Sequence, residues 1–259
     1  MQFVMQDPTH GVIIPSYNAG LLLVETLNAV LKVWRPVTVV LDGCTDGSDE
    51  RLAGILAENE GVHVITMPRN EGKGAAVFAA LSYGRRQGWS HALVFDSDGQ
   101  HSVEDIPRFM QASKRYPEAM ILGVPVFGED APAVRVWGRC LGNWWANLET
   151  LWGGIRDSLF GFRVYPVNKS LEILSQIRGG RRFDFDTQLA VRLYWDGVQP
   201  VNLYTKVVYR SRMRGGVSHF HYFHDNLLLF LVHANLAWEA LFLVPHLWRL
   251  RQRPPLDFQ

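Results

Sequence analysis

Two carboxylates stand two positions apart where an apolar run of the sequence ends. Asp96 and Asp98 come at the end of the run Ala92–Phe95, and Gln100 adds a neutral side-chain oxygen two residues later. Oxygen ligands of this kind suit Mg²⁺ or Mn²⁺, and these ions often complete their coordination with substrate phosphates. The same residues also suit an ordinary turn. We favour the metal because the pair follows the fourth of several such runs.

Polar residues also follow the three earlier runs. They are Pro15, Tyr17 and Asn18 after Val12–Ile14, Asp42 and Asp46 after Val37–Leu41, and Arg69 and Lys73 after His63–Thr66. A carboxylate at Asp42 suits the N–H of a nucleotide base, whereas helix capping suits Ser48 and Asp49 better. The Gly-bearing turn between Arg69 and Lys73 precedes a helix, and backbone N–H groups there favour phosphate.

The elements that must position these residues alternate along the first half. Strands are predicted at Val12–Ile14, Val37–Leu41, His63–Thr66, Ala92–Phe95 and Met120–Val124, and helices at Leu21–Trp34, Ser48–Glu60, Lys73–Gln87 and Val103–Tyr116. This alternation predicts an α/β fold, with a mainly parallel, Rossmann-like sheet and helices on both faces. Ligands of such sheets bind at the carboxyl ends of the strands, where the polar residues stand.

The second half is less regular and differs in charge. It predicts a helix or helix pair at Val134–Trp152, a strand at Phe162–Pro166, helices at Asn168–Ile177 and Asp186–Asp196, and one or two strands within Val198–Tyr209. Residues 1–130 hold 10 Lys and Arg against 16 Asp and Glu, a net charge of −6, whereas residues 131–259 hold 16 against 9, a net charge of +7. We expect the two halves to have different functions. The charge pattern does not indicate the uniformly basic face of a nucleic-acid-binding protein. The short segment Gly128–Pro132 is the best linker candidate.

Several common classes are disfavoured by what the sequence lacks. The segment around Lys73 departs from a Walker A loop, and no G-x-G-x-x-G follows the first strand, which disfavours a dinucleotide-dependent oxidoreductase. The two cysteines, Cys44 and Cys140, cannot build a disulfide scaffold and favour reduced thiols in the cytoplasm. Met1–His10 has neither the basic region nor the apolar run of a signal peptide.

Taken together, six segments resemble family 2 glycosyltransferases with the GT-A fold, nearest to the dolichol-phosphate-mannose synthase type. They are IIPSYN, VLDGCTDGSDE, RNEGKGAA, VFDSDGQH, DSLFGFRVYP and FDFDTQL. The resemblance runs from about Val12 to His219. It implies a UDP- or GDP-sugar donor held by Pro15, Tyr17 and Asp42, a divalent cation on Asp96, Asp98 and Gln100, and a phosphate-contacting segment at Gly161–Arg163 near the acceptor.

The chain departs from the family pattern at three places. Leu41 stands where the family commonly has the first of two adjacent Asp, and Gln188 stands where an acidic residue is frequent. The family's acceptor motif corresponds to Arg212–His219, with shifted arginines and His219 in place of Lys. Arg212, Arg214, Ser218 and His219 are the acceptor candidates there. The sugar, the base and the acceptor stay open.

The resemblance and the chemistry of the leaving group predict an inverting transfer. A metal ion would stabilise the departing diphosphate as a Lewis acid. A hydroxyl acceptor needs a general base, for which Asp184 or Asp186 is the candidate, whereas a lipid phosphate is already ionised and needs none. Both Asp residues also suit the first turn of the following helix. A zinc site on His219, His221 and His224 is the minor alternative for the histidines.

The C-terminal stretch Leu227–Leu247 is long enough to span a bilayer. His233, Asn235 and Glu239 interrupt it, and Arg249, Arg251 and Arg253 follow it, which favours a helix lying at the membrane interface or docking on a partner. A terminal helix packed on the domain remains the alternative.

The sequence thus predicts a GT-A domain over residues 1–220, with a donor half (1–130) and an acceptor half (131–220), followed by a C-terminal helix over 221–259. The expected activity is transfer of a sugar from a nucleotide diphosphate to a lipid-linked or envelope acceptor, at the cytoplasmic face of the membrane. The alternatives are a sugar-1-phosphate nucleotidylyltransferase and a non-catalytic binding protein on the same fold.

Overall fold

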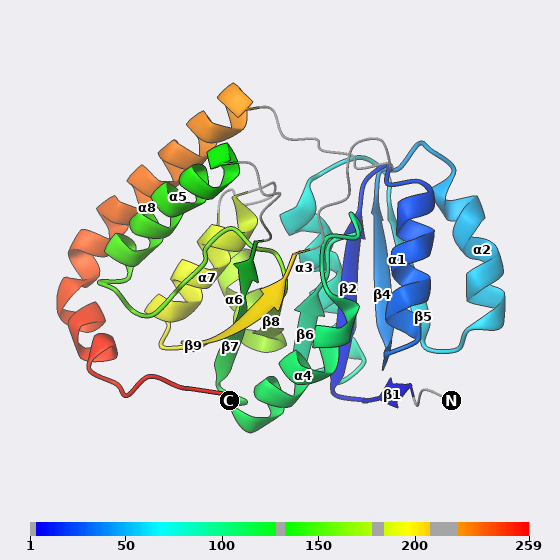
Figure 1. Ribbon diagram of the computed structural model, residues 1–259, viewed down its shortest axis with the longest axis horizontal. Coiled ribbons are helices and arrows are strands. Elements are labelled where there is room, and N and C mark those ends of the chain that lie inside the picture. The colour runs from blue at the N-terminus through cyan, green and yellow to red at the C-terminus, as the bar shows by residue number, and fades with distance from the viewer. Residues whose placement is uncertain (1–3, 128–132, 178–183, 208–221, 259) are drawn as a thin grey trace.

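Seven strands pair into one sheet in the computed structural model, in the order β5-β4-β2-β6-β8-β7-β9 (Figure 1). The structure describes residues 4–127, 133–177, 184–207 and 222–258. The strands are β2 (His10–Ser16), β4 (Val37–Asp42), β5 (Val62–Met67), β6 (His91–Val94), β7 (Ala119–Val126), β8 (Arg163–Pro166) and β9 (Gln199–Lys206). All five strands expected in the first half are therefore confirmed, within a residue or two at each end.

Helices cover both faces of the sheet (Figure 1). They are α1 (Leu21–Leu31), α2 (Ser48–Glu58), α3 (Lys73–Arg86), α4 (Ile106–Arg115, after the 3₁₀ turn Val103–Asp105), α5 (Ala133–Glu149), α6 (Val167–Gln176), α7 (Phe185–Trp195) and α8 (Tyr222–Arg251). Successive strand residues point to opposite faces. Ile13 of β2 accordingly packs with the core that contains α3, and Val12 and Ile14 pack with the core that contains α1 and α4.

β8 is the exception in an otherwise parallel sheet. It runs antiparallel to both β6 and β7, with Val164 opposite Leu93 on one side and Ile121 on the other. Because β8 runs the other way, the residues just before it lie at the edge where the parallel strands end. Gly161 and Phe162 are thereby brought beside the residues that follow β6.

Two helices end three residues earlier than the sequence pattern predicts. The first was expected to reach Trp34, but α1 ends at Leu31, and Trp34–Arg35 forms the short strand β3, paired with β1 (Met5–Gln6). The Trp34 indole donates a hydrogen bond to the His10 carbonyl, 2.9 Å away. The predicted Val134–Trp152 segment is one helix that ends at Glu149, since Leu151 and Trp152 have φ of 49° and 58°.

α8 lies side by side with α5 (Figure 1) and also contacts α7. Its buried residues recur at helical spacing: Leu236, Ala240, Leu247 and Leu250. Beyond the helix, the tail crosses to the opposite core, where Leu256 and Phe258 pack. The predicted linker 128–132 lies outside the described residues, and the division into 1–220 and 221–259 stays a prediction.

Candidate active site

The amino group of Lys73 is the centre of a charged cluster at the edge where the parallel strands end. Lys73 begins α3, and its Nζ lies 2.7 Å from Asp96 Oδ1 and 2.8 Å from Asp186 Oδ2. Asp96 follows β6, and Asp186 belongs to the first turn of α7. Gly161 backs the cluster, because a Cβ there would lie 2.4 Å from Lys73 Nζ and 2.7 Å from Asp96 Oδ2. The fold therefore brings together residues that the sequence assigned separately to donor, metal, acceptor and catalysis.

His101 fixes the position of Asp96. Its Nδ1 accepts a hydrogen bond from the Asp96 backbone N–H at 3.2 Å, and its Nε2 lies 3.5 Å from Asp96 Oδ2. The rings of Phe95, Phe160 and Phe162 surround the imidazole. Burial lowers the pKa of His101, which keeps the ring neutral with its remaining proton directed at the carboxylate. Sequence reasoning assigned no role to His101, although this residue ends the same polar run.

The two aspartates of this run differ in their electrostatics. Burial alone raises the pKa of Asp96, but the charge of Lys73 outweighs it and leaves the pKa below its ordinary value. For Asp98, burial and the neighbouring charge of Asp96 both raise the pKa. Asp98 Oδ1 also accepts the backbone N–H of Gln100 at 3.0 Å. Divalent cation binding would relieve the mutual repulsion of the two carboxylates.

These oxygens fit a divalent cation whose shell a substrate completes. In the described part of the chain, no group of three or more His, Cys, Asp or Glu side chains is arranged to hold a metal. Mg²⁺ is commonly held by only one or two carboxylates, together with water and substrate phosphates. Asp96 and Asp98 supply those two carboxylates, and the half-buried Gln100 lies beside them.

Asp42 is almost fully buried and holds the loop that precedes α3. Its two carboxylate oxygens accept the backbone N–H groups of Glu71 and Gly72, each at 2.8 Å. Both amides precede α3, so Asp42 fixes this loop and does not cap a helix, a role that the sequence did not suggest. Sequence spacing missed this contact because the amides lie about thirty positions further along the chain. A base contact by Asp42 stays a prediction.

Asp46 and Asn18 join the loops that follow β2 and β4. Asp46 accepts hydrogen bonds from the Gly20 N–H at 2.8 Å and from Ser48 Oγ at 2.6 Å. Burial opposes ionisation of Asp46, but these bonds outweigh it, so the pKa lies below its ordinary value. Asn18, with φ of 50°, accepts the Thr45 N–H at 2.8 Å. Both residues shape the donor-side edge of the predicted site.

The other donor candidates vary in exposure. Pro15 is buried within β2, whereas the Tyr17 side chain just beyond it is exposed. Arg69 is the most open, with 80% of its side chain exposed and its Nε 3.1 Å from Glu71 Oε1. Tyr17 and Arg69 are thus accessible to a ligand in this structure, and a donor contact by Pro15 stays a prediction.

Arg163 requires a correction. It was expected to contact a phosphate, but its side chain is fully buried in the structure. Its guanidinium donates to the carbonyl oxygens of Phe160 and Asp157 at 2.7 and 3.1 Å, and to the Asp186 carbonyl at 2.5 Å. Arg163 therefore ties the Phe160–Phe162 segment to the first turn of α7, and it positions Asp186 rather than facing solvent.

The two candidate bases have different surroundings. Asp186 is 5% exposed, with one carboxylate oxygen on Lys73 and the other, Oδ1, buried without a hydrogen-bond partner among the described residues. Asp184 is half-buried at the start of α7 and accepts a hydrogen bond from Gln188 Nε2 at 2.7 Å. Gln188, which departs from the family pattern, thus supports Asp184 from one helical turn away.

The remaining acceptor candidates have no described position. Arg212, Arg214, Ser218 and His219 lie outside the described residues, as does His221 of the alternative zinc group.

One helix in the described chain is long and apolar enough to cross a membrane by length and composition, Leu229–Arg251 within α8. In this structure one face of it is docked on the domain. His233 Nδ1 lies 2.7 Å from Glu149 Oε1 of α5, and Glu239 Oε2 lies 2.7 Å from Arg192 Nη1 of α7. The opposite face carries exposed aromatic and aliphatic side chains: Phe230, Leu231, Trp238, Leu241, Phe242 and Trp248.

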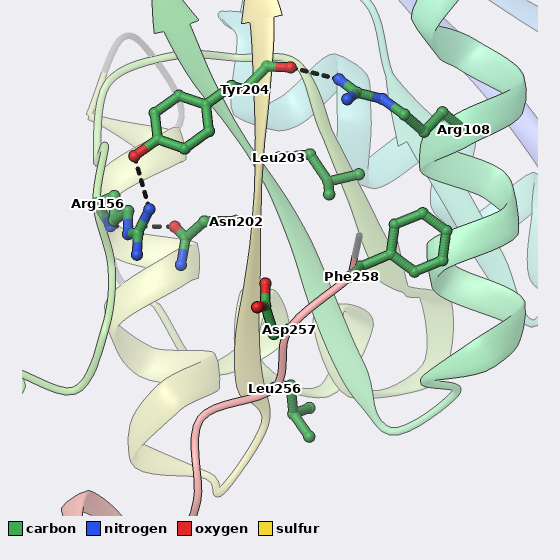
Figure 2. A pocket seen from close by; sticks show the side chains of 8 residues that line it. All are labelled: Arg108, Arg156, Asn202, Leu203, Tyr204, Leu256, Asp257 and Phe258. Carbon is green, nitrogen blue, oxygen red and sulfur yellow. Dashed lines mark hydrogen bonds between the residues drawn. The ribbon is translucent and has the colours of Figure 1, made fainter.

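A small polar cavity of about 160 Å³ lies along β9, the edge strand, between α4 and the C-terminal tail (Figure 2). Tyr204 lies between two arginines there, with its hydroxyl 2.6 Å from Arg156 Nη1 and its carbonyl bonded by Arg108. This cavity shares no lining residue with the Lys73 cluster, so it is a separate feature.

The comparisons with known proteins agree with the fold and the motifs. The profile of Glycosyl transferase family 2 matches residues 11–168. Undecaprenyl-phosphate mannosyltransferase from Micrococcus luteus is 24% identical over 227 residues, or 79% of this chain and 87% of that protein. Polyprenol monophosphomannose synthase from Mycolicibacterium smegmatis is 33% identical over 170 residues, or 60% of each chain.

Among solved structures, glucosyl-3-phosphoglycerate synthase from Mycobacterium tuberculosis, in complex with Mn²⁺, UDP and glucosyl-3-phosphoglycerate, superposes with a TM-score of 0.58. The sequence identity is 18%, and the match covers 79% of this chain and 72% of that one. This similarity establishes the GT-A-like fold.

Proposed function

The chain belongs to glycosyl transferase family 2, and from this premise we propose that it transfers a sugar from a nucleotide diphosphate to a polyprenyl phosphate, with inversion and with the help of Mg²⁺ or Mn²⁺. Its relatives include a mannosyltransferase named for undecaprenyl phosphate and a polyprenol monophosphomannose synthase. The observation that carries the proposal is the placement of Asp96 and Asp98 at the end of β6, beside Lys73 and Gly161. Family membership disfavours the nucleotidylyltransferase alternative.

On the donor side, we place the nucleotide over the ends of β2 and β4 and the diphosphate near Asp96 and Asp98. A bound divalent cation would supply Lewis-acid stabilisation of the leaving diphosphate. The residues of the chain hold the geometry: His101 orients Asp96, and Asp42 fixes the loop that leads to Lys73. Tyr17 and Arg69 are exposed and accessible to the base or the phosphates.

The surroundings of the acidic residues favour a phosphate acceptor over a hydroxyl acceptor. A hydroxyl needs a base that can take its proton. Asp186 is buried and its carboxylate is ion-paired with Lys73, and the Asp184 carboxylate accepts a hydrogen bond from Gln188, so both carboxylates are already engaged. A phosphate monoester is already ionised near neutral pH and attacks without such a base. The nucleophile would approach from the face opposite the leaving group, which inverts the anomeric carbon.

We propose that the outer face of α8 lies on the cytoplasmic leaflet of the membrane. Phe242 is 72% exposed and Trp238 is 63% exposed, and Trp144 of the neighbouring α5 is also exposed. Apolar patches of this kind mark interaction surfaces, and Trp favours the membrane interface. Arg249 and Arg251 close the helix and suit anionic headgroups. A lipid-linked acceptor would then reach the protein from this surface.

Calorimetric titration with UDP and GDP, with and without Mn²⁺, tests the proposed donor site. We expect Mn²⁺-dependent binding of one nucleotide, and Asp98→Asn should abolish both this dependence and turnover with polyprenyl phosphate. Asp257→Asn, at an exposed position in the tail, is the matched control. If neither nucleotide binds under any condition, the enzymatic proposal fails and the non-catalytic alternative gains support.

Liposome flotation tests the membrane surface. The double variant Trp238→Ser, Phe242→Ser should lose binding to vesicles that contain phosphatidylglycerol, because it removes apolar area from the outer face only. Deleting α8 is a poorer test, because Leu236 and Leu247 belong to the core. Phe78→Ser, which alters an exposed apolar residue of α3, is the control. If the wild type, the double variant and Phe78→Ser float equally, α8 is not the membrane contact.

A further inference from the structure

The ammonium group of Lys73 is paired with Asp96, a carboxylate that a metal ion would need as a ligand. Its Nζ lies 2.7 Å from Asp96 Oδ1, which is ion-pair distance, and only 17% of its side chain is exposed. The backbone at Gly161 closes one side of this position, since even a single added Cβ on that glycine would collide with Lys73 Nζ. The ammonium group is therefore confined rather than free to move through solvent.

The cluster has a second anionic place for the same ammonium group. Asp186 Oδ2 lies 2.8 Å from Lys73 Nζ, and Asp186 Oδ1 is buried with no hydrogen-bond partner in the part of the chain that the structure describes. A buried carboxylate oxygen without a partner is costly, so this atom can gain a donor if the ammonium group shifts. Asp186 itself is held in place, because its backbone carbonyl accepts a hydrogen bond from Arg163.

The charges of the cluster show why the ammonium group matters. Asp96, Asp98 and Asp186 are three acids at one edge of the sheet. Lys73 is then the basic side chain that contacts two of the three acids in the described site. A divalent cation beside Lys73 would meet both the carboxylates that attract it and a positive charge that repels it.

We propose that Lys73 is a built-in counter-cation, which pairs with both Asp96 and Asp186 in the metal-free protein and keeps only Asp186 when a divalent cation binds Asp96. This inference rests on the metal site of the proposed function and adds a positioning role for Lys73. It implies that the protein alone binds the metal weakly, since metal and ammonium compete for one carboxylate. The negative diphosphate of the donor offsets that competition, so metal and donor bind together.

The test is the Mn²⁺ affinity of Lys73→Met without nucleotide, measured from the electron paramagnetic resonance signal of free Mn²⁺. Removing the competing charge should tighten binding about tenfold or more. A purely structural role for Lys73 would leave the affinity unchanged or weaken it. Lys114→Met is the matched control, because Lys114 also pairs with a buried aspartate, Asp7, but lies at the opposite edge of the sheet. Its Mn²⁺ affinity should equal that of the wild type.

Circular dichroism and thermal melting establish that each variant is folded, and Lys73→Gln replaces Lys73→Met if the latter is not. The same titration with UDP and with GDP separates two failures. If neither the wild type nor any variant binds Mn²⁺, with or without nucleotide, the metal site of the proposed function is wrong. If the wild type binds Mn²⁺ and the Lys73 variant binds it no more tightly, the counter-cation is wrong and the metal site stands.

A crystal structure of the wild type with Mn²⁺ and the nucleotide that binds supplies a test that needs no variant. We expect Lys73 Nζ to lie against Asp186 and beyond ion-pair distance from Asp96. An ammonium group still paired with Asp96 while Mn²⁺ occupies the same carboxylate would overturn the inference.

Discussion

Replacing Arg163 by Met should lower the free energy of unfolding by about 4 kcal/mol. The guanidinium is fully buried and donates to three carbonyl oxygens, and it also lies 3.0 Å from the Tyr165 hydroxyl. Hydrogen bonds to a charged group contribute about 1.5–3 kcal/mol each, and desolvation of the guanidinium offsets several kcal/mol of their sum. Breaking such buried charged contacts typically costs about 3–5 kcal/mol, which brackets the expected value.

Urea denaturation at neutral pH measures this loss, and a thermal melt should show a decrease of about 10 °C. Arg156→Met is the control, because Arg156 is exposed and its ion–hydroxyl contact with Tyr204 should contribute less than about 1 kcal/mol. The opposite result would be informative. If Arg163→Met has the melting temperature of the wild type but loses affinity for polyprenyl phosphate, Arg163 contacts the acceptor and the structural role is wrong.

Three other substitutions probe the site and the core. Burial and the charge of His91 lower the pKa of His10 from 6.5 to about 4. Between these pH values the unfolded chain binds a proton at His10 that the folded protein does not. The contribution of neutral His10 to the free energy of unfolding is therefore complete above pH 6.5 and decreases by about 3 kcal/mol towards pH 4. Urea denaturation at several pH values in this range should show that the free energy of unfolding of His10→Gln depends less on pH than that of the wild type. An equal pH dependence would contradict the lowered pKa of His10. Gly161→Ala should displace the Asp96 carboxylate, because the added Cβ would lie 2.7 Å from its Oδ2, and so weaken Mn²⁺-dependent nucleotide binding about tenfold; calorimetry that shows wild-type affinity would refute this. Asp42→Asn should cost about 1–2 kcal/mol in urea, because one of two backbone N–H groups loses its acceptor, and an equal midpoint would count against this role.

The elements of the sheet could be predicted because their signal is local. β-branched runs such as Val37–Leu41 alternate with helical stretches, and the resulting strand ends carried most of the polar candidates. The direction of β8 could not be predicted in this way, since a four-residue strand looks the same in either direction. Its reversal places Gly161 against Lys73, so part of the site depends on a pairing that local sequence does not encode.

The roles of buried polar residues were the harder part, and Arg163 and Asp42 show why. Residue type suggested phosphate and base contacts, since arginine and aspartate commonly make them. Their partners include backbone groups far away in the sequence: the Asp186 carbonyl for Arg163 and the Gly72 amide for Asp42. Backbone groups carry no residue signature, so spacing and composition cannot reveal such contacts. His101 was overlooked for a related reason, because its partner is also a backbone group, the Asp96 N–H five residues earlier in the same run.

The sequence of α8 likewise did not show what each face of the helix contacts, and its polar residues indicate which face lies on the domain. In a spanning helix, His233 and Glu239 would be costly at membrane depth, and in a solvated helix they would face water. Here they meet Glu149 and Arg192 on the domain side, while Phe242 and other apolar side chains point outward. Water on the outer side would leave that apolar face uncompensated. A helix with the domain on one side and lipid on the other would satisfy both faces, which is why we propose that α8 lies at the surface of the membrane rather than in its interior.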